Sequence, residues 1–352
     1  MARLASFSPQ SAKLRVALLA ASAAACLAVQ ADSLFAPSAT QADQVWRLPA
    51  PPMPADNMTT PSRVELGRAL FFDPRLAGSG AMSCATCHNP SLGWSDGLKT
   101  AIGANGKVLG RATPTITNTA YNTQFMWDGR KKSLEDQALG PMQSRDEMAS
   151  DMHGMSQRLA SVQGYAAMFA AAYPGQPISS DTIAKAIAAF ERTIVVRNTA
   201  FDRWLDGDAQ ALNQQQWRGY KVFNDPVKGN CVACHSAPNF TDNGYHNVGL
   251  NPAGNGDMGR YAIRQVASLK GAFKTPSLRD IAATAPYFHD GRMADLAQVV
   301  DYYERIGVHR TEGLSPSIRP LQLTVQDKQD LVMFLQALSS PSQSYAVPSL
   351  PQ

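Results

Sequence analysis

Two stretches of five residues decide the fold of this chain: Cys84-Ala85-Thr86-Cys87-His88 and Cys231-Val232-Ala233-Cys234-His235. Each has the spacing Cys-x-x-Cys-His, and together they contain four of the five cysteines in the sequence. The fifth, Cys26, lies in an apolar N-terminal segment. In an oxidising compartment four lone thiols would form disulfides unless another chemistry used them. The motif that surrounds each pair indicates what that chemistry is.

The Cys-x-x-Cys-His motif attaches a c-type haem through two thioether bonds, and its histidine becomes the proximal ligand of the iron. We therefore expect Cys84, Cys87, Cys231 and Cys234 to bind two haems covalently. His88 and His235 are the expected iron ligands. A single such motif could instead be a redox cysteine pair or half of a zinc site. Two copies without a spare cysteine favour two haems.

The sequence around the motifs also repeats. Gly67-x-x-x-Phe71-x-Asp73-Pro74 precedes the first, and Gly219-x-x-x-Phe223-x-Asp225-Pro226 precedes the second. After the motifs, Thr113-Pro114 matches Thr275-Pro276 at 275 − 113 = 162 residues, and the same offset matches Trp127-Asp128-Gly129-Arg130 with His289-Asp290-Gly291-Arg292. The repeat predicts homologous haem domains at 63–200 and 201–340. The Pro- and Ser-rich composition outside them indicates segments that are either ordered by contact or disordered, and we expect a Pro-rich arm at 32–62 and a disordered tail at 341–352.

Apolar residues at helical spacing predict the main elements of each half. Ile183, Ile187, Phe190 and Ile194 follow a polar start at Ser180-Asp181. Near the C-terminus, Thr324 and Asp327 form a capping pattern before Leu331, Phe334, Leu335 and Leu338. No long alternating stretch suggests a sheet. The sequence thus predicts a mainly α protein with two cytochrome c-like domains in tandem and long functional loops.

The first 31 residues have the pattern of an export signal. Arg3, Lys13 and Arg15 precede an apolar stretch at 16–29, which ends in the small-residue pattern Val29-Gln30-Ala31. A signal anchor and a lipid-modified Cys26 are the alternatives. Cleavage would lower the formal charge from +4 to 4 − 3 = +1, a balance that attracts neither nucleic acid nor an anionic membrane. We expect a periplasmic protein that leaves the membrane after signal cleavage.

The sixth position of each iron separates electron transfer from chemistry. The offset of 162 places Tyr303 opposite 303 − 162 = 141, which is Pro141. The second haem would then receive a phenol oxygen, whereas proline cannot bind iron and would leave the first haem open to peroxide. Gln137 and Glu147 flank Pro141 closely enough to move protons there. Rival ligands to Tyr303 are Met258, Met293 and Tyr302.

These residues resemble the bacterial dihaem cytochrome c peroxidase and MauG family from about Arg63 to Leu338. The resemblance rests on both haem motifs and on Leu66-Gly67-Arg68-x-Leu70-Phe71-Phe72-Asp73, Trp127-Asp128-Gly129-Arg130, Leu134-Glu135-Asp136-Gln137, Gly140-Pro141, Glu147-Met148 and Ala285-Pro286-Tyr287-Phe288-His289-Asp290-Gly291.

The resemblance implies a peroxide site at the first haem, an electron-entry or charge-sharing second haem, and Trp127 between them. It also implies distal roles for Gln137 and Glu147. A calcium ion would be bound by the backbone carbonyls of Thr284 and Pro286, while the position of the family's amide ligand falls at Ala112.

Two departures resemble the MauG-type branch. Tyr303 stands where ordinary peroxidases of the family carry Met, and no histidine lies between His88 and His153. Members of that branch keep the first haem open and oxidise residues of a partner protein. However, Lys228-Gly229-Asn230 occupies the place of the surface tryptophan that MauG uses. His289, the counterpart of Trp127, is expected to support the second haem without binding iron.

The predicted function is therefore a periplasmic peroxidase that reduces hydrogen peroxide with electrons from a small periplasmic donor. Two alternatives remain open. One is MauG-like, peroxide-dependent modification of a partner protein. The other is a non-catalytic dihaem electron carrier, in which both irons would be six-coordinate and Glu147 would have no role.

Overall fold

The computed structural model describes residues 34–250, 256–306, 308, 313–341 and 344–352. The predicted signal at 1–31 lies outside the described residues. Within them, no helix is both long and apolar enough to cross a membrane.

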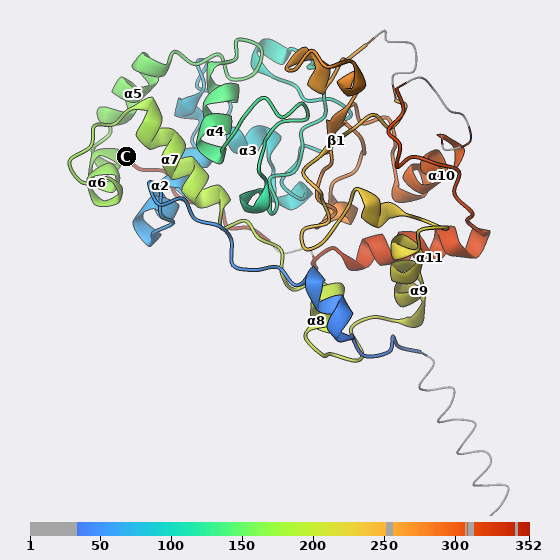
Figure 1. The fold of residues 1–352 in the computed structure, drawn as a ribbon. Helices are drawn as coiled ribbons and strands as arrows, with labels where there is room; N and C mark the ends of the chain where they lie inside the picture. Colours follow the sequence, from blue (N-terminus) through green and yellow to red (C-terminus); the bar gives the residue numbers. More distant parts are fainter. Residues whose placement is uncertain (1–33, 251–255, 307, 309–312, 342–343) are drawn as a thin grey trace, which may run out of the picture.

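The chain is rich in helix and has very little sheet (Figure 1). Two short strands, β1 (Tyr245–His246) and β2 (Phe273–Lys274), pair antiparallel, with Tyr245 opposite Lys274. The predicted mainly α class is confirmed. The α-helices are α2 (Pro61–Phe71), α3 (Cys84–Cys87), α4 (Leu134–Gln143), α5 (Met152–Ala160), α6 (Gln163–Ala172), α7 (Ser180–Glu191), α8 (Ala200–Leu205), α9 (Gln214–Asn224), α10 (Leu296–Ile306) and α11 (Val325–Ala337).

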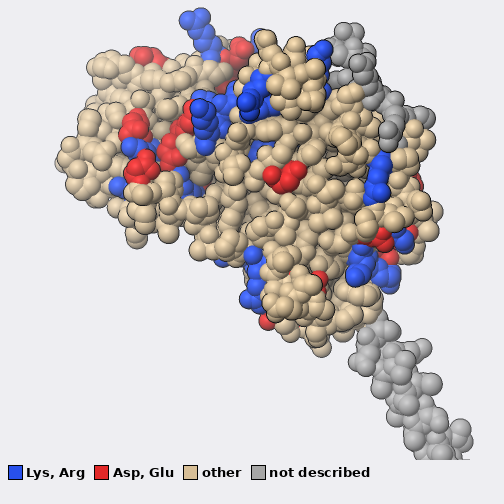
Figure 2. Space-filling view, viewed as in Figure 1, with Lys and Arg blue, Asp and Glu red and all other residues tan. Residues whose placement is uncertain are grey.

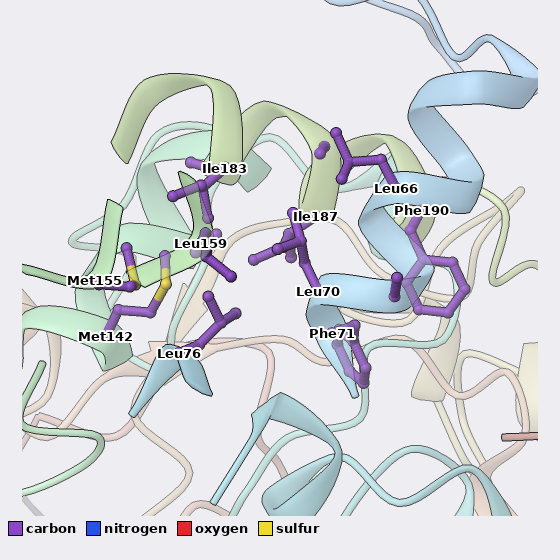
Figure 3. Close-up of a cluster of buried hydrophobic side chains, with 14 of the residues drawn as sticks. Leu66, Leu70, Phe71, Leu76, Met142, Met155, Leu159, Ile183, Ile187 and Phe190 are labelled. Atoms are coloured by element: carbon purple, nitrogen blue, oxygen red, sulfur yellow. The ribbon is translucent and has the colours of Figure 1, made fainter. Parts of the chain in front are cut away.

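One helix before the first motif and one helix after it build the core of the N-terminal half. Helices α2 and α7 pack together through a close approach at Gly67, where an added Cβ would lie 1.9 Å from the Ala186 carbonyl oxygen. Side chains from both helices then interdigitate (Figure 3), and Phe71 meets Phe190 edge to face at 5.3 Å. Only glycine permits this packing distance.

The C-terminal half repeats the same construction. Helices α9 and α11 approach at Gly219, where an added Cβ would lie 1.9 Å from the Asp330 carbonyl oxygen. The N-terminal arm contributes to this second core through a 3-10 helix, η1 (Gln41–Trp46). Trp46 is 3% exposed and stacks on Phe240 with ring centroids 4.4 Å apart. The arm therefore belongs to the packed structure of the C-terminal half.

The loops after the motifs keep the register of 162 residues in their backbone conformation. Asn118 and Asp280 both have positive φ, at 58° and 62°. Met126 and Phe288 have φ of 69° and 70°, and such values are uncommon outside glycine. The turns also match, because Phe125 donates to the Lys131 carbonyl as Tyr287 donates to that of Met293. Equivalent positions in the two loops can therefore be compared residue by residue.

The prediction of a disordered tail at 341–352 was wrong for the residues that the structure describes there. Tyr345 stacks on Phe72 at 5.5 Å and meets Trp94 at 5.0 Å. The chain then ends beside α6, where the Gly164 amide donates to the Gln352 carbonyl at 3.0 Å (Figure 1). A Ser- and Pro-rich composition disfavours regular helix or strand. One aromatic side chain that packs against aromatic residues of the folded domain is nevertheless enough to hold the segment in place.

On the face seen in Figure 2, several Lys and Arg side chains gather toward the top of the view, groups of both signs lie at the left and the lower right, and wide uncharged stretches separate them.

Candidate functional site

The second motif opens onto a cavity of largely apolar lining. Cys231, Cys234 and His235 line it from the turn that follows α9, and Tyr303 lines it from α10. The apolar residues include Leu331 and Leu335 of α11. Two free thiols, an imidazole and a phenol around an apolar space form a donor set that suits a covalently attached, iron-containing macrocycle. The residues present therefore fit a c-type haem.

The two motif histidines are held in the same way. His88 Nδ1 lies 3.1 Å from the Trp94 carbonyl oxygen, and His235 Nδ1 lies 3.0 Å from that of Phe240. A carbonyl accepts from Nδ1–H, which selects the tautomer whose lone pair is on Nε2. Burial also lowers the pKa of both rings, so each is neutral and can donate that lone pair. Both halves thus present a neutral imidazole of the kind that a proximal ligand requires.

Tyr303 lies in the cavity of the second motif, unlike the other residues considered as ligands of the second iron. Among the described residues lining this cavity Tyr303 is present, whereas Met258, Met293 and Tyr302 are absent. The Tyr302 hydroxyl instead donates to the Val248 carbonyl at 2.7 Å. Burial raises the pKa of the Tyr303 hydroxyl, so a phenolate there needs a cation to stabilise it.

Helix α4 of the first half is the counterpart of α10 and carries Pro141 in place of Tyr303. Gln137 and Pro141 are four residues apart on this helix and therefore share a face. The chain then turns, with the Met148 amide donating to the Pro141 carbonyl at 3.1 Å. Glu147 is half-buried in this turn, held by its carbonyl, which accepts from the Ala104 amide at 2.7 Å.

The turn also brings Glu147 toward the first haem motif. Burial raises the pKa of the Cys87 thiol to about 11, and the charges of Asp96 and Glu147 add to that effect. A pocket lined by Cys87, Thr86, Met82 and Leu98 lies beside the motif. Pro141, Gln137 and Glu147 thus belong to one helix and the turn that follows it, next to the first motif.

Trp127 lies where the two halves meet. Its indole N–H donates to the Ala112 carbonyl at 2.9 Å, and its own carbonyl accepts from the Lys274 amide at 2.8 Å. The equivalent hydrogen bond at the matching positions is donated by the Ala112 amide of the N-terminal half to the His289 carbonyl of the C-terminal half, at 2.7 Å. Trp127 and His289 also meet edge to face at 6.5 Å, and both line the second cavity. The two loops therefore exchange equivalent contacts across the junction.

His289 and Lys274 add two buried nitrogen groups to this cavity. Burial lowers the pKa of His289 to about 4, and its ring stacks on Phe273 at 3.6 Å. Burial also lowers the pKa of Lys274 to about 8, and its Nζ donates to the Thr275 carbonyl at 3.1 Å. Sequence reasoning missed Lys274. Its counterpart at 274 − 162 = 112 is Ala112, and this contrast was the available signal.

One group of residues has the composition of a metal site, with ligand atoms of Cys234, Asp242 and His246 within 4.8 Å of one another. Cys234 is, however, one of the expected thioether sulfurs. Hydrogen bonding to Asp242, 2.8 Å away, raises the pKa of His246 to about 10, with a contribution from Cys234. A cationic imidazole has no lone pair for a metal. We interpret Asp242 and His246 as an ion pair at the edge of the cavity.

Comparison with known proteins agrees with this arrangement. Residues 61–210 match the family model described as di-haem cytochrome c peroxidase. The chain is 44% identical over 301 residues to the methylamine utilization protein MauG of Methylorubrum extorquens, covering 85% of this chain and 84% of that protein. It is 36% identical over 330 residues to the cytochrome c551 peroxidase of Pseudomonas aeruginosa, covering 92% and 89%.

A solved structure gives the same result for the fold. The crystal structure of a MauG-like protein associated with microbial copper homeostasis has a TM-score of 0.78 and 33% identity, covering 83% of this chain and 93% of that one. Relatives of both kinds, MauG and peroxidase, thus span most of the chain, and the family implies two haem c groups. This chain belongs to the di-haem cytochrome c peroxidase and MauG family of oxidoreductases that act on peroxide.

Proposed function

We propose that this protein reduces hydrogen peroxide at the haem held by Cys84, Cys87 and His88, and that the haem held by Cys231, Cys234 and His235 shares or relays the oxidising equivalents. The observation that carries the proposal is the contrast between Pro141 and Tyr303. Tyr303 lines the second cavity, and the matching position on α4 has a side chain that cannot bind iron. The first iron is then open to peroxide.

The haem would supply peroxide binding and electron transfer, and this chain's own residues would move the protons. A carboxylate oxygen of Glu147 takes a proton from hydrogen peroxide and returns it to the oxygen that leaves as water. Gln137, on the same face of α4 as Pro141, donates a hydrogen bond that orients the peroxide. Two electrons and two protons convert one hydrogen peroxide into two waters.

Two sources could supply those electrons, and they correspond to the two kinds of relatives. A small periplasmic electron donor would make the protein a peroxidase like the cytochrome c551 peroxidases. A partner protein that loses electrons from its own side chains would make it MauG-like. Tyr303 favours the second source, because an anionic oxygen ligand stabilises the ferric state and makes the second haem a poor electron acceptor.

Electron paramagnetic resonance of the oxidised protein tests the open site. We expect one high-spin and one low-spin haem in the protein as isolated, without prior reduction. Two low-spin haems would contradict the proposal and support the electron carrier. Peroxide consumption with a reduced small cytochrome, compared with consumption in the presence of proteins encoded by neighbouring genes, then separates the two electron sources.

We further propose that residues 1–31 direct export and are removed, so that the protein acts in the periplasm. The charge pattern and the small-residue ending of this segment support the proposal. Mass spectrometry of the protein from a periplasmic extract should give a mature chain that starts near Asp32. An intact N-terminus in a membrane fraction would instead indicate a signal anchor.

A calcium ion is proposed at the carbonyls of Thr284 and Pro286. Among the described residues neither carbonyl accepts a hydrogen bond, which leaves both oxygens available to a hard cation. Ala112 offers no side-chain oxygen, so water would complete the coordination. Elemental analysis should find one calcium per chain, and a calcium chelator should lower the midpoint of thermal unfolding.

A further inference from the structure

Helix α7 ends in a carboxyl group that the proposed function does not use. Glu191 is 4% exposed, and its Oε2 atom has no hydrogen-bond partner among the described residues. A buried, unpaired polar atom costs free energy, which the fold must offset elsewhere. Such an atom in a native protein therefore calls for a partner or a role.

The repeat shows where this carboxyl group points. Gly67 packs against Ala186 and Phe190, and Gly219 packs in the same way against Asp330 and Phe334. The residue after Phe190 is Glu191, and the residue after Phe334 is Leu335. Leu335 lines the cavity of the second motif.

By this correspondence Glu191 faces the space beside the first motif. Its proximity to Cys84 agrees, because the charge of Glu191 adds to the burial that raises the pKa of that thiol. The first haem site thus contains an acid where the second contains a leucine.

The charged and titratable groups around Glu191 come from three elements. Arg192 follows it in the chain, and its guanidinium is directed to Glu135 of α4 at 2.5 Å. Glu135 accepts a second hydrogen bond from Asn57 at 2.7 Å, and Cys84 faces Glu191 from α3. Burial, opposed by Arg192, raises the pKa of Glu191 to about 8. Glu191 therefore carries a proton at neutral pH, while the pKa of Glu135 is lowered and that carboxylate stays ionised.

We propose that Glu191 is a redox-linked acid of the first haem site, which holds a proton when that site is reduced and releases it when the site is oxidised. Loss of an electron leaves an additional positive charge beside the buried carboxyl group, and at low dielectric this charge favours the carboxylate. The electron passes to an oxidant, which is peroxide in turnover, and the proton passes to solvent. The second site has Leu335 and lacks this acid.

Potentiometric titration of the holoprotein over a range of pH tests the proposal without peroxide or a partner. The inference rests on the first motif holding a haem and is independent of which electron source is correct. Below the pKa of Glu191 in the oxidised protein, the midpoint potential of the first haem should not depend on Glu191. Between that pKa and the higher pKa of Glu191 in the reduced protein, the equilibrium constant for reduction should fall about tenfold per pH unit, or ~59 mV for one electron.

Two variants and one control make the result specific. Glu191→Gln keeps the shape of the side chain, and Glu191→Leu reproduces the second half. Both should remove this pH dependence from the first haem and leave the potential of the second haem unchanged. Glu65→Gln, the control, removes an exposed carboxylate of the same half that pairs with Arg68, and it should retain the pH dependence.

Infrared difference spectra between the oxidised and reduced protein give a second readout. A carbonyl band of a protonated carboxylic acid should appear on reduction and be missing in Glu191→Gln. An unchanged pH dependence in both Glu191 variants would overturn the proposal. Loss of the pH dependence in Glu65→Gln, or an unchanged carbonyl band in Glu191→Gln, would also overturn the proposal, because the proton would then belong to another group.

Discussion

The two halves of the chain are built alike, and in the proposed function single residues determine how their haem sites differ. Helices α4 and α10 follow matching loops, yet α4 carries Pro141 where α10 carries Tyr303. The proximal side shows no such contrast, because His88 and His235 each face a backbone carbonyl through Nδ1. In the proposed function, chemistry at one haem and electron storage at the other therefore depend on the residues opposite the motif histidines. Two substitutions test this view directly.

Glu147→Gln should slow the reaction with peroxide by about a hundredfold, because a positioned proton-transfer group contributes about 10²–10⁴ in rate. Both haem spectra should remain those of the parent, since the amide has nearly the shape of the carboxyl group. Stopped-flow mixing with hydrogen peroxide measures the rate. Asp146→Asn is the control, because Asp146 is exposed in the same turn and should not affect the rate. Equal rates for Glu147→Gln and the parent would remove Glu147 from the mechanism.

Tyr303→Met should raise the potential of the second haem, because a neutral sulfur ligand favours the ferrous state more than a phenolate does. The variant should also accept electrons from a small cytochrome more readily and keep the oxidised state formed by peroxide for a shorter time. Potentiometry and stopped-flow spectra measure both effects. Tyr302→Phe is the control, since the Tyr302 hydroxyl donates to the Val248 carbonyl and Tyr302 itself does not line the cavity. If the second haem keeps its spectrum and potential in Tyr303→Met, Tyr303 is not its ligand, and the MauG-like function loses its support.

Among the larger elements, the terminal segments tie the two halves together. The N-terminal arm places Trp46 in the C-terminal core, and the C-terminal tail places Tyr345 against Phe72 and Trp94 of the N-terminal half. Each of these two described segments is thus held by the half that is more distant in sequence. The tail also approaches the first haem site, because the carbonyl of Trp94 faces His88.

Tyr345→Ala should therefore lower the free energy of unfolding by about 1–2 kcal/mol, the usual scale for losing a half-buried aromatic contact. Denaturant unfolding followed by haem absorbance measures the change. Val347→Ala is the matched control, because Val347 is 66% exposed in the same tail and its loss should change stability by less than about 0.5 kcal/mol. Equal stability of the two variants would mean that the tail does not dock in solution.

The molecule as a whole shows which features a sequence can predict. The offset of 162 residues brought Pro141 opposite Tyr303 and Trp127 opposite His289, because matching loops of a duplicated fold keep their length. The burial of Glu191 and Lys274 could not be predicted in this way. Glu-Arg pairs and lysines are usually solvated, and only the packing of α7 and of the loop beside Trp127 excludes water from these two. Docking of the tail likewise depends on the surface formed by Phe72 and Trp94, which the sequence alone does not reveal.

The two haem sites should act as one unit only if electrons cross the junction at which Trp127 lies. Its indole bonds to Ala112 and contacts His289, so it belongs to both loops. Trp127→Phe should keep both haem spectra while slowing the effect of peroxide on the second haem by about tenfold or more, equivalent to a barrier raised by about 1.4 kcal/mol. Trp94→Phe is the matched control, because it copies Phe240 of the second half and leaves the junction intact. Stopped-flow spectra at the low-spin band measure both variants. If the second haem responds to peroxide as fast in Trp127→Phe as in Trp94→Phe, electrons pass between the halves by a route that does not need the indole.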